Sequence, residues 1–145
     1  MWHESSSDEY TINGLKPYTD YTVYVKAEDS GGEVVKYSKA VKTTDTTNPN
    51  IKIEKGNFTI EEKDPSNHIN YDYYKSLYLD VTASDNDQIG SIKYCTSSSE
   101  CNPTTSLTLT DGKGTIQMPS ANSNQKLCVK ATDRKGNFTS TCSDN

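Results

Sequence analysis

The chain has 145 residues, enough for one large domain or two small ones, and only 31% of them are hydrophobic. Ser and Thr together account for 35 residues, and Tyr, with ten copies, is the main large side chain. The formal net charge of −5 argues against a generally basic nucleic-acid binder. No apolar run approaches the roughly 20 residues that a membrane-spanning helix needs. We therefore expect no nucleic-acid partner and no membrane insertion.

Apolar and polar residues alternate in most segments, which is the period of a half-buried antiparallel strand. No segment carries the i, i+3, i+4, i+7 apolar stripe of a helix. The sequence therefore predicts an all-β protein. The strands are expected, in chain order, near residues 10–12, 21–27, 34–43, 51–53, 77–83, 89–94, 107–109, 115–118, 127–131 and 138–143.

A proline-containing motif precedes the second of these strands. Residues 15–21 read Leu-x-Pro-x-Thr-x-Tyr, and residues 23–27 read Val-x-Val-x-Ala. This pattern resembles the end of the E strand and the F strand of a fibronectin type III domain. The resemblance implies a tyrosine corner made of Leu15, Pro17 and Tyr21, in which the Tyr21 ring is buried and its hydroxyl bonds to upstream backbone.

Only part of such a domain can be found in the sequence. Residues 38–44 resemble its final G strand, so the resemblance covers residues 10–44. A sandwich of this type has seven strands in about 100 residues, and Met1–Glu9 is too short and too polar to supply the missing ones. We expect residues 1–45 to be a partial module that is unstable alone, in a chain cut from a longer protein.

The pattern changes at residues 45–50, Asp-Thr-Thr-Asn-Pro-Asn, which resemble the short junctions between tandem Ig-like modules of bacterial surface proteins. We place a linker at 46–49 and a second domain at 50–145. Residues 129–137, Val-x-Ala-x-Asp-x-x-Gly-Asn, are similar to the F–G hairpin of bacterial Ig-like repeats, and residues 83–94 to their B–C region. The fold class is thus an antiparallel immunoglobulin-like β-sandwich preceded by a partial fibronectin type III module.

All four cysteines, Cys95, Cys101, Cys128 and Cys142, lie in this second domain. An even number in a chain that looks extracellular indicates disulfides. Cys128 and Cys142 lie symmetrically about Lys135, so we favour Cys128–Cys142 across the hairpin together with Cys95–Cys101. The competing pair is Cys95–Cys128, because the C and F strands are neighbours. The spacings do not match the Cys-x2–4-Cys pairs of a four-thiolate zinc site.

Two acidic residues of the expected B–C loop, Asp85 and Asp87, are a weak calcium candidate, because carboxylate oxygens are the ligands that calcium prefers. The order of residues in an EF-hand loop is absent. A solvated, turn-forming loop is the simpler interpretation. No metal and no cofactor are therefore predicted.

A polar and aromatic patch follows the long polar segment at residues 61–68. Tyr rings can stack on sugar faces while neighbouring polar groups bond to hydroxyls. The patch is therefore a possible glycan-binding site, but the favoured interpretation is that the rings are ordinary half-buried cover for the sandwich edge. Its members are Asn70, Tyr71, Asp72, Tyr73 and Tyr74.

Catalytic signatures are missing from the sequence. Neither His3 nor His68 lies at a recognised spacing from a nucleophile, and no phosphate-binding or hydrolase motif occurs. We predict no catalytic residues and no enzyme activity. Asn57 and Asn137 begin N-glycosylation sequons, which we expect to be unmodified in a bacterial protein.

The sequence thus predicts a non-catalytic extracellular module, secreted or attached to the cell wall of a bacterium, that serves as a spacer or in adhesion. The expected partners are neighbouring domains of a longer chain, and a polysaccharide or an extracellular host protein. Two alternatives stay open. One is a carbohydrate-binding accessory module of a secreted glycan-degrading enzyme, and the other is a strand-accepting module that forms oligomers.

Overall fold

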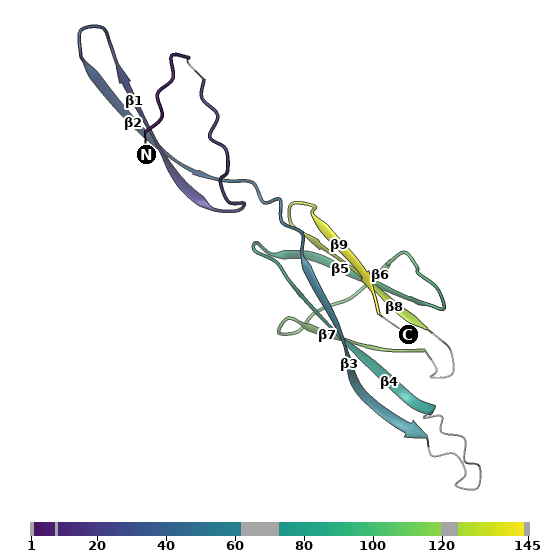
Figure 1. The fold of residues 1–145 in the computed structure, drawn as a ribbon. Coiled ribbons are helices and arrows are strands. Elements are labelled where there is room, and N and C mark those ends of the chain that lie inside the picture. The colour runs from purple at the N-terminus through teal and green to yellow at the C-terminus, as the bar shows by residue number, and fades with distance from the viewer. Residues whose placement is uncertain (1, 8, 62–72, 120–124, 144–145) are drawn as a thin grey trace. The chain divides into compact units, whose positions relative to one another are not determined.

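A computed structural model describes residues 2–7, 9–61, 73–119 and 125–143 (Figure 1). The described residues form strands and turns but no helix, so the prediction of an all-β fold is confirmed. The chain divides into two compact units, which are described separately. Unit 1 comprises residues 1–46 and unit 2 comprises residues 47–145.

Unit 1 contains an antiparallel hairpin made of β1 (Asp20–Glu28) and β2 (Val34–Lys42). The turn between them depends on Asp29, whose Oδ1 accepts hydrogen bonds from the backbone N–H groups of Gly31 and Glu33 at 2.8 and 2.9 Å. An acidic side chain that bonds to the backbone two residues ahead is a common way to start a turn.

The strand predicted at residues 10–12 was wrong. These residues lie in an extended segment without a backbone ladder, and the side chains of Tyr10 and Ile12 are exposed. Alternating residues become a strand only when a neighbouring strand accepts and donates their backbone hydrogen bonds. Within the described part of unit 1, β1 and β2 pair with each other and no third strand is formed.

Unit 2 consists of two antiparallel sheets. One has the strand order β3-β4-β7 and the other β6-β5-β8-β9, which is the three-plus-four arrangement of a β-sandwich. The strands of the first sheet are β3 (Asn50–Glu61), β4 (Tyr73–Ser84) and β7 (Lys113–Gln117). Those of the second are β5 (Ile89–Ser97), β6 (Thr105–Ser106), β8 (Lys126–Asp133) and β9 (Phe138–Cys142).

The core of unit 2 is made by residues that alternate along these strands. Strand β8 lies between β5 and β9 and contributes Leu127, Val129 and Ala131, none of which has measurable exposure. Val81 of β4 and Ile116 of β7 belong to the same buried cluster. Because the period of a strand is two, one face of each sheet faces the other sheet and is apolar.

Asp111 and Gly112 form a hairpin turn, but the strand predicted just before it, at 107–109, was wrong. Thr110 and Lys113 exchange both backbone hydrogen bonds, and φ is +52° at Asp111 and +78° at Gly112, as a type I′ turn requires. Residues 107–109 lie between β6 of one sheet and β7 of the other. Leu107 still donates its backbone N–H to the Ile92 carbonyl of β5 at 2.9 Å, and the ladder ends there as the chain crosses to the other sheet.

Candidate functional site

The corner at the start of β1 is held by one tyrosine. The hydroxyl of Tyr21 accepts a hydrogen bond from the backbone N–H of Lys16 at 3.0 Å, which is the bond that a tyrosine corner implies. Leu15 and Pro17 flank Lys16 and are exposed, and the Tyr21 ring is half-buried rather than buried as the resemblance implied. Thr43, just after β2, also stabilises the corner, because its hydroxyl donates a hydrogen bond to the Lys16 carbonyl at 2.6 Å.

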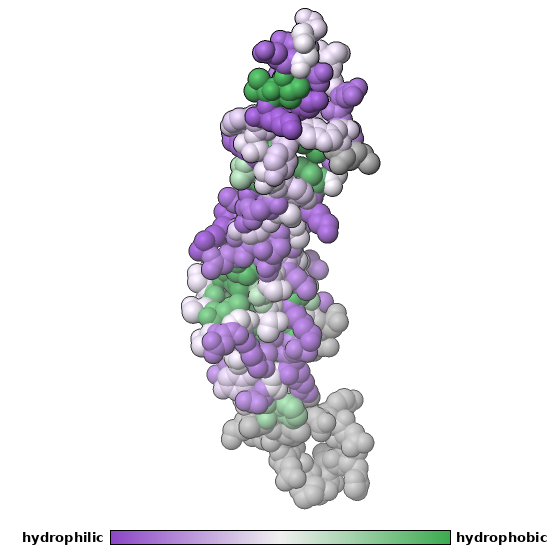
Figure 2. All heavy atoms as spheres, turned by 90° about the vertical axis from the view of Figure 1, so that its left-hand side faces the viewer, coloured by the Kyte–Doolittle hydropathy of each residue, from purple (hydrophilic) through white to green (hydrophobic). Residues whose placement is uncertain are grey.

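One face of the β1–β2 hairpin is mostly apolar, and the half of it nearest the turn between the strands is exposed. Residues directly opposite each other in an antiparallel pair share a face, and the pairs Val25–Tyr37 and Ala27–Val35 lie on the same side. Val35, Tyr37 and Val25 are 70%, 63% and 52% exposed. Figure 2 shows hydrophobic side chains at the surface of the part that contains β1 and β2. We call this the apolar hairpin face: Tyr21, Val23, Val25, Ala27, Val35, Tyr37, Lys39 and Val41.

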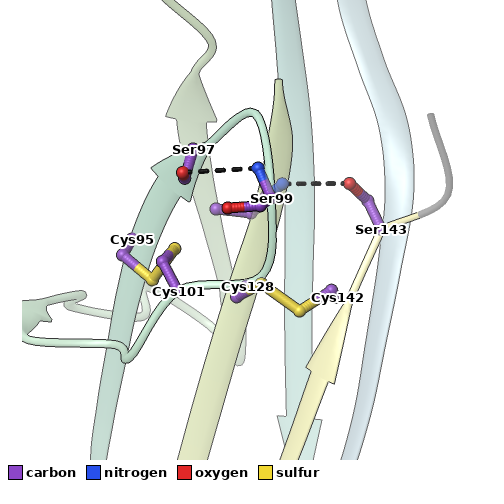
Figure 3. Close-up of a disulfide and its surroundings, with 8 residues drawn as sticks. Cys95, Ser97, Ser99, Cys101, Cys128, Cys142 and Ser143 are labelled. Atoms are coloured by element: carbon purple, nitrogen blue, oxygen red, sulfur yellow. Dashed lines mark hydrogen bonds between the residues drawn. A yellow bond between two sulfur atoms is a disulfide. The ribbon is translucent and has the colours of Figure 1, made fainter. Parts of the chain in front are cut away.

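Two disulfides, Cys95–Cys101 and Cys128–Cys142, are formed, and they are the pairing favoured from the sequence (Figure 3). The second bond joins directly opposite residues of β8 and β9, with 4.0 Å between the Cα atoms. The first closes the small loop between β5 and Cys101. Cys128 is fully buried, and its sulfur atom lies within 4.8 Å of those of Cys95 and Cys101.

The turn between β8 and β9 is organised by the buried side chain of Asp133. Its Oδ1 accepts hydrogen bonds from the backbone N–H groups of Lys135 and Asn137 at 2.7 and 2.9 Å, and its Oδ2 accepts one from the Asn137 amide at 2.7 Å. Burial raises the pKa of Asp133, but these bonds and one from the backbone of Gly136 outweigh it, so the pKa lies below its usual range. Asp133 is therefore a structural carboxylate.

The calcium candidates lie in the turn between β4 and β5. Oδ2 of Asp85 accepts a hydrogen bond from the backbone N–H of Asp87 at 3.0 Å, which is a turn-forming contact. A carboxylate oxygen of Asp85 also lies within 4.8 Å of one of Asp133, a proximity that the sequence analysis missed. Calcium takes six to eight oxygen ligands, and this pair supplies only part of such a shell. Calcium binding stays a prediction.

A charged cluster on β4 and β7 was also missed. Oδ2 of Asp80 lies 2.7 Å from Nζ of Lys113, and its Oδ1 accepts a hydrogen bond from the Thr115 hydroxyl at 2.8 Å. The hydrogen bond from Lys113, followed by that from Thr115, holds the pKa of Asp80 below its usual range. The alternation on β7 places these two residues on one face, but only the pairing of β7 with β4 brings Asp80 to them.

The possible glycan-binding patch falls largely outside the described residues. Asn70, Tyr71 and Asp72 lie outside them, and of Tyr73 and Tyr74 only the backbone, at the start of β4, is described. Glycan binding therefore stays a prediction. Of the two sequon asparagines, Asn57 is exposed where the register of β3 shifts, whereas Asn137 bonds to Asp133.

Residues 2–44 match the family model of the fibronectin type III domain. The match supports a domain of this type in unit 1, and it begins at Trp2, whereas the resemblance found in the sequence begins at Tyr10. No curated protein and no solved structure matches the chain. Among the described residues, no helix has the length and apolar character needed to cross a membrane.

Proposed function

We propose that this chain is a segment of an extracellular bacterial protein in which β-sandwich modules space or attach neighbouring domains. In this proposal, residues 1–45 are part of a fibronectin type III module, residues 46–49 are a linker, and residues 50–145 are an Ig-like sandwich. The observation that carries it is the fibronectin type III match beside a second all-β unit with two disulfides. Fibronectin type III sandwiches are generally non-catalytic modules.

The disulfides support the extracellular part of the proposal. Structural disulfides form and persist in oxidising compartments such as the periplasm and the cell exterior. The core of unit 2 is small among the described residues, where the largest fully buried side chains are Leu127, Val81, Val129 and Cys128. Cross-links that stabilise a small core are typical of secreted domains.

Two measurements on the parent protein test this proposal. An antibody raised against residues 50–145 should label intact cells or detect the protein in the medium, and cysteine alkylation without reduction should find both disulfides formed. Deleting the segment should leave the activity of a neighbouring domain intact in solution and reduce it at the cell surface. Detection only inside the cell, with all four cysteines reduced, would contradict the proposal.

A second candidate function rests on the apolar hairpin face. A fibronectin type III sandwich covers such a face with a second sheet, and unit 1 pairs only two strands among its described residues. We propose that the occupant is the remaining sheet of such a sandwich. A second copy of the hairpin would cover the apolar hairpin face with too small an interface. Two nine-residue strands present about 30 by 10 Å, or roughly 300 Å² per partner, against the ~800 Å² of a stable interface.

The molar mass of the chain from light scattering, together with hydrogen exchange, distinguishes the remaining sheet from a second copy as the occupant of the apolar hairpin face. We expect a monomer whose β1–β2 amides exchange quickly with deuterium, and slow exchange once the parent chain's neighbouring residues are included. A stable dimer with protected β1–β2 amides would show instead that a second copy covers the face.

A further inference from the structure

The two disulfides of unit 2 form a single sulfur cluster. Cys95 of β5 lies directly opposite Cys128 of β8, and Cys128 lies directly opposite Cys142 of β9, so three cysteines form a row across neighbouring strands. The loop that follows β5 returns Cys101 to the same face, and the two bonds lie side by side (Figure 3). The sulfur atoms of Cys95, Cys101 and Cys128 lie within 4.8 Å of one another.

The positions of Cys95 and Cys128 also fit the geometry of a disulfide between them, a bond that the structure does not contain. Directly opposite residues of an antiparallel pair have Cα atoms about 4.5–5.5 Å apart, which is within the range for a disulfide. Cys95 and Cys128 therefore need side-chain rotation but no backbone movement to bond. Cys95 and Cys142 are two strand spacings apart, roughly 9–10 Å, which is too far for a bond.

Three of the four cysteines are partly accessible to solvent: Cys128 has no exposed surface, whereas Cys95, Cys101 and Cys142 are each partly exposed. Cys101 lies outside the strands, between the exposed residues Glu100 and Asn102. Cys95 and Cys142 lie within β5 and β9, and the residues next to each of them are half-buried. An external thiol therefore reaches the Cys101 sulfur most easily.

We propose that Cys101 is the attachment site of a small external thiol, and that its attachment transfers the second disulfide to Cys95–Cys128. The external thiolate attacks the Cys101 sulfur, the Cys95–Cys101 bond breaks, and its electron pair leaves on Cys95. The Cys95 thiolate then attacks the Cys128 sulfur, the Cys128–Cys142 bond breaks, and Cys142 leaves as a thiolate. Two disulfides are present before and after, so no further oxidant or reductant is needed.

The exchange leaves the sheet in place. Beside the Cys128–Cys142 bond, the backbone N–H of Leu127 donates to the Ser143 hydroxyl at 3.0 Å, and the Ser143 N–H donates to the Leu127 carbonyl at 2.8 Å. These bonds hold the end of the β8–β9 ladder when the disulfide opens. The new bond would cross-link β5 to β8, the two central strands of their sheet.

The first test uses the oxidised chain with an equimolar amount of reduced glutathione at about pH 8, near the ordinary thiol pKa of about 8.5, because an excess would remove the attached glutathione again. After an acid quench, free thiols are alkylated and peptides are mapped by mass spectrometry. We expect one glutathione on Cys101, a Cys95–Cys128 cross-link and an alkylated Cys142. Glutathione on Cys101 with Cys128–Cys142 intact and Cys95 alkylated would overturn the transfer. Absence of any attachment, or attachment on Cys95, would overturn the assigned site.

The second test needs no external thiol. In Cys101→Ser, Cys95 has no bonding partner and is a free thiol from the start. At about pH 8, Cys95 should attack Cys128 in part of the molecules, so that the free thiol is then found on Cys142. The exchange should be much slower at acidic pH, because the thiolate is the nucleophile. The control is Cys95→Ser/Cys101→Ser, which keeps Cys128–Cys142 and has no attacking thiol. A circular dichroism spectrum like that of the wild type shows that the variants fold. If Cys142 is labelled no more in Cys101→Ser than in this control, the transfer does not occur.

Discussion

Cys95 and Cys128 lie directly opposite each other on β5 and β8, yet each is bonded to a different cysteine. Both existing bonds are local in sequence, with separations of 6 and 14 residues. Neither bond joins the two sheets of unit 2, since all the bonded strands belong to the sheet of β6, β5, β8 and β9. Cohesion between the sheets therefore depends on the buried core.

Removing the Cys128–Cys142 bond should destabilise unit 2 more than removing Cys95–Cys101. In the chain-entropy account, Cys128–Cys142 stabilises the folded state by about 3 kcal/mol and Cys95–Cys101 by about 2 kcal/mol, because each closes a loop of the unfolded chain. We expect the free energy of unfolding in urea to fall by about these amounts in Cys128→Ala/Cys142→Ala and Cys95→Ala/Cys101→Ala. A larger loss in the second variant would show that packing around Cys101 matters more than loop closure.

The Asp133 carboxylate should make unit 2 sensitive to acid. Its pKa in the folded state is lowered, so its stabilising contribution is complete above the ordinary pKa of about 3.9 and is lost as the pH falls through the folded value. Asp133→Asn should lower the melting temperature at neutral pH and flatten its decline below about pH 4.

The control for this variant is Asp111→Asn, an exposed turn residue whose left-handed conformation asparagine also accepts. It should leave the melting temperature at neutral pH nearly unchanged. Equal slopes of melting temperature against pH in Asp133→Asn and the wild type would contradict the assigned role of Asp133.

A side chain at Gly90 should push β5 away from the turn that follows β8. A Cβ atom at this position would lie 2.8 Å from the backbone carbonyl oxygen of Asp133, a distance that side-chain rotation cannot relieve. We expect Gly90→Ala to destabilise unit 2 by about 1–3 kcal/mol, as overpacking usually does. Thermal unfolding measures this, with Ser91→Ala at the next, exposed position as the control. Equal melting temperatures would show that the turn moves freely.

The tyrosine corner should stabilise unit 1 locally. Tyr21→Phe removes the hydroxyl that accepts the N–H of Lys16, a hydrogen bond with a net contribution of about 0.5–1.5 kcal/mol. Hydrogen exchange at the Lys16 amide should therefore become faster, and exchange in unit 2 should not change. Tyr24→Phe, on the other face of β1 and exposed, is the matched control. The corner is unimportant if both variants exchange Lys16 at the wild-type rate.

Several features could be predicted because they depend on neighbouring residues. The alternation at 21–27 and 77–83 marks strands β1 and β4, since the period of a strand is a local property. Asp111 and Gly112 indicate their turn because these residue types accept positive φ. The pairing of Cys128 with Cys142 follows from their equal distances from one hairpin turn.

Other features were decided only by the tertiary structure. Residues 10–12 and 107–109 alternate like strands, but a strand also needs a pairing partner, and neither segment pairs along its length with another strand of the described residues. The sequence left Cys95 and Cys142 both open as partners of Cys128, and the pairing of distant strands placed Cys95 opposite Cys128 without a bond between them. The approach of Asp85 to Asp133 results from which segments meet at one end of the sandwich. The sequence by itself thus indicated most of the strands and turns that the structure describes, because those follow from local residue types. The tertiary structure decided which sulfur atoms and which carboxylates lie together, because that depends on contacts between residues far apart in the chain.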